Sequence, residues 1–122
     1  MANTFKVSTI NSVPTTSDAN TSIIYTTPPA TTTVVLALLL SNKHTAEINT
    51  SAQVVSSTSN TGSNNNIGPN ATAYIIKDVP IEKKNTLEIL SGQKYILQSG
   101  DSVKVYAENS NIDVIFSYME MT

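Results

Sequence analysis

Few side chains in this sequence have the chemistry of a catalytic or metal-binding site. His44 is the only histidine, and it stands beside Lys43 with no nucleophile or second ligand nearby in the sequence. A structural metal site needs about four ligands, and a catalytic base needs a nucleophile to act on. We therefore interpret His44 as an exposed turn residue and expect no metal site.

The carboxylates of Asp78 and Glu82, four positions apart, are the next candidates, because such a pair can share a proton or hold calcium. Lys77, Lys83 and Lys84 alternate with them, which favours a solvated turn whose charges neutralise one another. The chain also has no cysteine, no glycine-rich phosphate loop and no Gly-x-Ser-x-Gly element. We predict that the protein is not an enzyme and has neither catalytic residues nor a cofactor.

Tyrosines are the remaining side chains that often form binding sites, and they are spread along the chain. The five are Tyr25, Tyr74, Tyr95, Tyr106 and Tyr118. Tyrosine in a strand more often caps a core or marks a protein interface than it lines a sugar-binding face, because its ring is apolar while its hydroxyl needs a partner. We favour core or interface positions, and we keep a carbohydrate-binding adhesion module as an alternative function.

The composition excludes two classes of partner. Charged residues make up 13% of the 122 residues, the net charge is −2 and arginine is absent, so the chain offers no phosphate-neutralising stripe for nucleic acid. Residues 1–13 lack the basic start and apolar run of a signal peptide, and no segment reaches membrane-spanning length. We expect neither a nucleic acid nor a membrane as partner. Ser, Thr and Asn occupy 45 positions instead, as suits strands and turns.

The stretch from Thr31 to Asn42 is the element around which we expect the fold to form. All seven residues from Val34 to Leu40 are apolar, with neither the alternation of a half-buried strand nor the period of an amphipathic helix. We predict a central strand that a second sheet covers on one face and another part of the structure covers on the other. Residues 46–55 are expected to form a hairpin with it.

Shorter strands are predicted on both sides of this stretch. In residues 4–10, Phe5 and Val7 alternate with polar residues, which predicts a strand that buries them on one face. Further strands are expected at 21–26, 73–78, 86–90, 94–98, 102–107 and 112–119. Val103 and Val105 are expected to point inward in residues 102–107, and Ile112, Val114, Phe116 and Tyr118 to share one face in residues 112–119. Eight or nine short strands without a helical stretch predict one all-β domain over residues 1–122, an antiparallel β-sandwich of immunoglobulin-like or jelly-roll type.

Residues 56–72 form a long polar segment in which Ile67 is the only large apolar side chain. Such a segment cannot bury enough surface to order itself, and structureless loops of this length are uncommon inside compact domains. It is either a surface loop or an extended arm that orders against a neighbouring molecule, and we favour the arm. Residues 1–20 are expected to supply the first strand and a loop.

Two segments resemble a known group of proteins. The runs IIYTTPPATTTVVLALLLSN and VPIEKKNTLEILSGQKYILQSGDSVKVYAENSNIDVIFSYMEM are similar to small virion structural proteins of tailed bacteriophages, including many from marine and cyanobacterial phages. The resemblance covers Thr21 to Met121, and the run from Val79 to Val105 is its most distinctive unit. The chain departs from the pattern at residues 56–72, where relatives usually have a tighter connection.

The resemblance implies a non-enzymatic virion component that is assembled in the host cytoplasm. Because the domain is small and single, we favour a capsid decoration or cement protein that packs on the major capsid protein. A neck, tail or baseplate component is the alternative within the same class. We also expect copies of the chain to associate into a homo-oligomer, as subunits of repetitive particles do.

The expected interface combines the central strand with the polar segment and the strand that follows it. The candidate residues are Val35, Ala37, Leu39, Asn64, Asn65, Asn66, Ile67 and Tyr74. This hypothesis requires their side chains to become covered only in the assembly.

Overall fold

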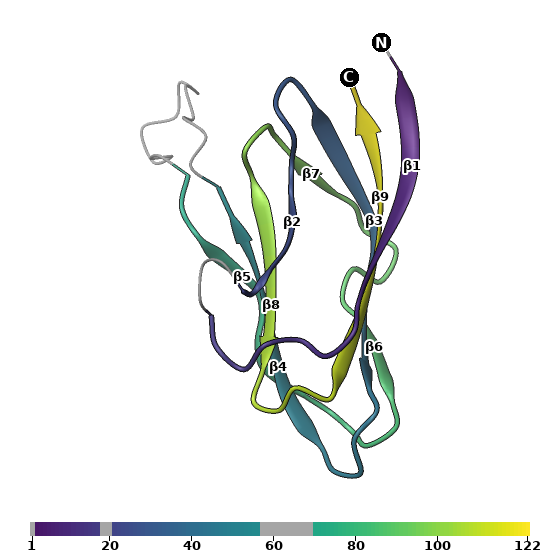
Figure 1. The fold of residues 1–122 in the computed structure, drawn as a ribbon, viewed down its shortest axis with the longest axis vertical. Helices are drawn as coiled ribbons and strands as arrows, with labels where there is room; N and C mark the ends of the chain where they lie inside the picture. The colour runs from purple at the N-terminus through teal and green to yellow at the C-terminus, as the bar shows by residue number, and fades with distance from the viewer. Residues whose placement is uncertain (1, 18–20, 57–69) are drawn as a thin grey trace.

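The computed structural model describes residues 2–17, 21–56 and 70–122. These residues form nine strands in two antiparallel sheets that lie face to face, without a helix (Figure 1). The all-β sandwich predicted from the strand pattern is confirmed. A search of the described residues for a helix that could cross a membrane finds none.

The first sheet, which we call sheet A, places the two ends of the chain beside the central strand. Its order is β1 (Asn3–Ile10), β9 (Ile112–Met121) and β3 (Thr32–Asn42). The far edge of β3 pairs with two short strands, β7 (Tyr95–Leu97) near its start and β6 (Thr86–Glu88) near its end. Sheet A is therefore four strand positions wide, with the fourth position shared by β7 and β6.

The second sheet, sheet B, contains β2 (Ile23–Thr26), β8 (Ser102–Ala107), β4 (Ile48–Val55) and β5 (Ala73–Ile81) in that order. β5 lies at an edge, where proline is tolerated because one side of the strand needs no ladder partner. The strand consequently continues through Pro80 to the end of β5, three residues beyond its predicted end.

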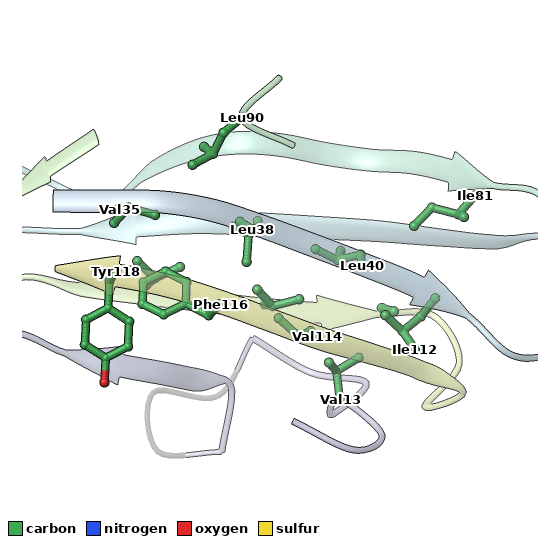
Figure 2. Packing of buried hydrophobic residues seen from close by; sticks show 14 of the residues in the cluster. Val13, Val35, Leu38, Leu40, Ile81, Leu90, Ile112, Val114, Phe116 and Tyr118 are labelled. Atoms are coloured by element: carbon green, nitrogen blue, oxygen red, sulfur yellow. The ribbon is translucent and has the colours of Figure 1, made fainter. Parts of the chain in front are cut away.

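The core lies between the sheets and is built by alternate residues of the long strands. The predicted inward set of β9 is confirmed, since Ile112, Val114, Phe116 and Tyr118 are all buried. In Figure 2 these side chains lie in one layer with those that β3 contributes to the core. The inner face of sheet A is thus fully occupied within the subunit.

The hairpin expected between β3 and β4 is wrong, because the two strands belong to different sheets. β9 occupies one edge of β3, while β6 and β7 share the other. The connection crosses from one layer to the next, and the buried Asn42 supports the crossing. Its side-chain amide donates hydrogen bonds to the carbonyl oxygens of Ala46 (3.0 Å) and Ile81 (2.9 Å).

β1 also differs from its prediction, although the strand itself is present. It pairs with β9 of its own subunit over all eight residues, and its register sets Phe5 opposite Met119 and Val7 opposite Ser117. These β9 residues alternate with the buried ones, so they lie on the outer face of sheet A. Phe5 and Val7 therefore point away from the core, and the expectation that they are buried is wrong.

Candidate protein-interaction face

Sheet A carries a nearly continuous apolar surface on the side away from the core. Residues that pair in register project to the same side of a sheet, so the pairing defines rows of neighbouring side chains. One row crosses the four strand positions as Phe5, Met119, Val34 and Ile96. Every member of this row is apolar.

The other rows continue this surface along the strands. The next contains Val7, Ser117 and Ala37, and the one after it contains Thr9, Ile115, Leu39 and Glu88. We call these three rows together the A-face. It comprises Phe5, Met119, Val34, Ile96, Val7, Ser117, Ala37, Thr9, Ile115, Leu39 and Glu88.

Exposure distinguishes the A-face from an ordinary surface. Within the described ranges, five large hydrophobic residues are exposed, and four of them belong to the A-face: Phe5 (72%), Ile96 (69%), Val7 (61%) and Ile115 (43%). Isolated exposed hydrophobic residues are normal, whereas a contiguous group commonly marks a site where another molecule binds. The concentration of these residues on one sheet face makes it the candidate site.

Among the eleven residues of the A-face, only Glu88 is charged. Glu88 is in the last row of the A-face, and Asp113 follows it one row further along β9. Asp113 is paired with Lys43 at 2.8 Å, and the hydrogen bond from this ammonium holds the pKa of the carboxyl below its ordinary value. The middle of the A-face is thus uncharged, as in the centre of a protein interface.

A buried polar network lies behind β1 on the opposite side of sheet A. Glu120 accepts hydrogen bonds from Lys6 (2.6 Å) and from the hydroxyl of Tyr25 (2.5 Å), and this hydroxyl lies 2.8 Å from that of Thr33. The hydrogen bond from Lys6 is the main cause that lowers the pKa of Glu120, whereas burial raises the pKa of Tyr25. Through these contacts the network joins β1 and β9 of sheet A to β2 of sheet B.

The sequence-predicted interface residues are divided among several places. Ala37 and Leu39 belong to the A-face and are half-buried, whereas Val35 lies in the core and is 1% exposed. Strict alternation would put all three on one side. A β-bulge between Val35 and Ala37 inserts one residue and reverses the phase, which removes Val35 from the candidate surface.

The other candidates lie away from the A-face. Tyr74 is exposed, but it belongs to the outer face of sheet B. Asn64, Asn65, Asn66 and Ile67 lie outside the described residues, as does most of the proposed arm.

Sequence reasoning missed Phe5, Val7, Ile96 and Ile115 as interface residues. The alternation in β1 identified Phe5 and Val7 as one set, but it could not tell which side of the sheet that set occupies. Ile115 was identifiable as the apolar residue between the inward Val114 and Phe116.

The outer face of sheet B has a different chemistry. The hydroxyls of Tyr74 and Tyr106 lie 2.8 Å apart, and Lys77 Nζ lies 5.2 Å from the centre of the Tyr74 ring. In register with these tyrosines are Gln53 and Ser51 of β4, which are polar. This face presents hydrogen-bonding groups where the A-face presents aliphatic ones.

An open cleft of about 500 Å³ lies where the edges of β5 and β7 face one another. Its lining residues are Val54, Ala73, Tyr74, Ile75, Lys94, Tyr95, Ile96 and Leu97. Two tyrosines are present, as a sugar-binding groove would require, but most of the remaining lining is aliphatic. Sugar recognition also needs several polar groups to bind hydroxyls, and this lining supplies few.

The residues considered first for chemistry do not converge. His44 Nδ1 lies 3.2 Å from the amide nitrogen of Asn111, and Asp78 contacts Ser51 through its side chain and its backbone amide. In the ranges that the structure describes, no three His, Cys, Asp or Glu side chains form a group that could hold a metal ion.

Comparisons of the chain with protein-family models, with curated proteins and with solved structures give no match.

Proposed function

We propose that this protein is a non-enzymatic structural subunit of a bacteriophage particle, in which the A-face is covered by protein. The observation that carries the proposal is the fully apolar row of Phe5, Met119, Val34 and Ile96 on the outer side of a sheet whose inner side is already packed. Folding of the subunit leaves Phe5 and Ile96 largely in water and buries Val34 and Met119 only in part. Covering it contributes about 25 cal/mol for each Å² of apolar surface removed from water.

The resemblance of the sequence to virion structural proteins of tailed phages supports the phage particle as the assembly. A capsid decoration or cement protein fits a small single domain best, and a neck, tail or baseplate subunit would use the same face. Attachment at many equivalent positions needs only modest affinity per contact, because neighbouring contacts raise the effective concentration. The exposed side chains of Phe5, Val7, Ile96 and Ile115 provide apolar surface for such a contact of modest affinity.

The test uses particles of a phage that carries this gene. Purified protein is added to particles that lack it, and binding is measured by co-sedimentation. Wild-type protein is expected to bind, the double variant Phe5→Ser/Ile96→Ser to lose at least about tenfold in affinity, and Tyr74→Ser to bind as the wild type does. Tyr74 is the matched control because, within the described ranges, it is the exposed large hydrophobic residue that lies outside the A-face.

Failure of the wild-type protein to bind, or equal binding of the double variant, would contradict the proposal. Electron cryo-microscopy of the reconstituted particles then distinguishes the two placements. Density over the shell supports a decoration protein, whereas density confined to the tail end supports a neck, tail or baseplate subunit.

A carbohydrate-binding adhesion module is the second candidate, favoured by the two tyrosines of the cleft between β5 and β7. This function predicts that the protein binds glycans on an array and that Tyr95→Ala abolishes the binding. Phe5→Ser would leave it unchanged, because Phe5 does not line the cleft.

A further inference from the structure

We propose that the A-face binds the A-face of a second copy of this chain, forming a face-to-face dimer about a twofold axis that runs parallel to the strands. The inference deepens the proposed function and rests on its premise that protein covers this face. It adds the identity of the occupant and its orientation.

The first argument is self-complementarity. A twofold interface brings one surface patch against itself, so every charge on the patch must tolerate its own image. The row of Phe5 and Ile96 and the row of Val7 and Ala37 carry no charged side chain. Two copies can therefore bury both rows without desolvating an ion, which is the costliest event in association.

The second argument is area. Four strand positions at ~4.8 Å, combined with a rise of ~3.4 Å per residue along the ten residues of β9, outline roughly 600 Å² in projection for the whole outer face of sheet A, and the three rows of the A-face make up about half of it. The accessible area is larger than this projection because side chains stand up from the sheet. A stable interface of standard size covers about 800 Å² per partner, so the dimer covers the whole outer face of sheet A, with the mainly polar rows beyond the A-face at its rim.

The orientation follows from where the most exposed residues lie. Phe5 and Ile96, the two most exposed large hydrophobic residues, occupy opposite edges of the same row. A twofold axis parallel to the strands exchanges the two edges, so that Phe5 of each copy meets Ile96 of the other. An axis across the strands would instead place Phe5 over the polar Thr9 and Ile96 over the charged Glu88.

The proposed packing is the ordinary face-to-face packing of two sheets, which lie about 10 Å apart with their strands within about 30° of one another. In the dimer, the axis passes between β9 and β3, close to Ser117 and Ala37 at every copy. Glu88 lies at the rim, where it remains in water.

Analytical ultracentrifugation of the full chain is the first test. The wild-type protein is expected to form a dimer at micromolar concentration, and Ile96→Ser to raise the dissociation constant at least about tenfold. Tyr74→Ser should dimerise like the wild type. Circular dichroism confirms that each variant is folded, and Phe5→Ser provides an independent A-face variant should Ile96→Ser be unfolded.

Cysteine cross-linking is the second test, and its result is easy to read because the chain has no cysteine. The reagent is a short bifunctional thiol cross-linker, because stacked sheets lie ~10 Å apart and a direct disulfide cannot span that distance. Ser117→Cys, close to the axis, is expected to cross-link to its own mate, and Phe5→Cys/Ile96→Cys to cross-link between copies. Val7→Cys alone should stay uncross-linked, because the two Val7 positions are separated by three strand spacings as well as by the distance between the sheets, ~17 Å in all. Efficient cross-linking of Val7→Cys would overturn the proposed axis.

A wild-type protein that stays monomeric in the centrifuge and gives no trapped Ser117→Cys dimer would overturn the dimer. If that monomer still binds phage particles through Phe5 and Ile96, the proposed function survives and the occupant is another virion protein. If the dimer forms but no particle binds it, the proposed function fails and the dimer stands.

Discussion

The outer faces of the two sheets present opposite chemistries to their surroundings. On sheet A, Phe5, Val7, Ile96 and Ile115 expose aliphatic and aromatic surface, and only Glu88 among the A-face residues is charged. On sheet B, the tyrosine hydroxyls hydrogen-bond one another and the neighbouring β4 residues are polar. The two inner faces, in contrast, are mainly apolar, apart from the polar network around Glu120.

This difference separates what folding requires from what it does not. A sandwich must bury the inner faces of both sheets, and an antiparallel sheet normally keeps its outer face polar. Sheet B follows that rule and sheet A departs from it. The exposed side chains of the A-face bury little apolar surface in the subunit alone, and this supports the proposed contact with another molecule.

The largest expected difference is in the loss of unfolding free energy when neighbouring residues of β9, one on the inner side of sheet A and one on the outer side, are replaced by alanine. Phe116→Ala is expected to destabilise the protein by about 3–5 kcal/mol, because the ring is fully buried and packs on Tyr25 and Tyr118. Ile115→Ala should cost less than about 1 kcal/mol, because its side chain is half exposed. Urea denaturation measures both, and equal losses would mean that Ile115 belongs to a core.

The next largest loss of stability is expected when the buried carboxylate of Glu120, on the inner side of sheet A, is replaced. Glu120→Gln is expected to cost about 1–3 kcal/mol at pH 7, because the Tyr25 hydroxyl loses its charged acceptor. The pKa of Glu120 is lower in the folded state than in the unfolded state, so its stabilisation is complete above the ordinary value of about 4.3 and is lost as the pH falls through the folded-state pKa.

The difference in unfolding free energy between wild type and Glu120→Gln should consequently be constant from about pH 7 to pH 5 and shrink below about pH 4.3. Asp113→Asn serves as the control at the outer rim. Its pKa is lowered in the same direction by Lys43, but the pair is exposed and worth about 0–1 kcal/mol. If the difference in unfolding free energy between wild type and Glu120→Gln grows as the pH falls, the ionised Glu120 does not stabilise the fold through this network.

The exposure contrast between the outer faces can be measured directly with a dye such as ANS that fluoresces on apolar surface. If the A-face is accessible in the free protein, Phe5→Ser/Ile96→Ser should reduce dye fluorescence several-fold, and Tyr74→Ser should change it little. Each substitution should alter stability by only about 0.5 kcal/mol, because these side chains are largely in water already. Unchanged fluorescence in the double variant would show that the A-face is already covered.

The smallest effect is expected on the outer face of sheet B. Tyr106→Phe removes the hydrogen bond to Tyr74, which is also the main cause of the raised pKa of Tyr106. A hydrogen bond between solvent-accessible hydroxyls contributes at most about 1 kcal/mol, so thermal unfolding should shift slightly and association should not change. Loss of association in Tyr106→Phe would move the interaction site to sheet B.

The sequence by itself determined the class of fold and the inward residues of the most regular strands. Strict alternation in residues 102–107 and 112–119 identified Val103, Val105 and Phe116 as core residues, because a strand places successive side chains on opposite faces. The same alternation identified Phe5 and Val7 as one set. The continuous apolar stretch of residues 34–40, which does not alternate, supplied Ala37 and Leu39, two members of the A-face.

Only the tertiary structure decided which side each set occupies and which sheet each strand joins. Alternation shows which residues share a face but not whether that face points to the core or to solvent. The register of β1 on β9 was needed to place Phe5 and Val7 on the outer face. The bulge that reverses Val35, the crossing of β4 to sheet B and the contact of Tyr25 with Glu120 all depend on residues far apart in the chain. The A-face exists because these long-range pairings bring four strand positions into one plane.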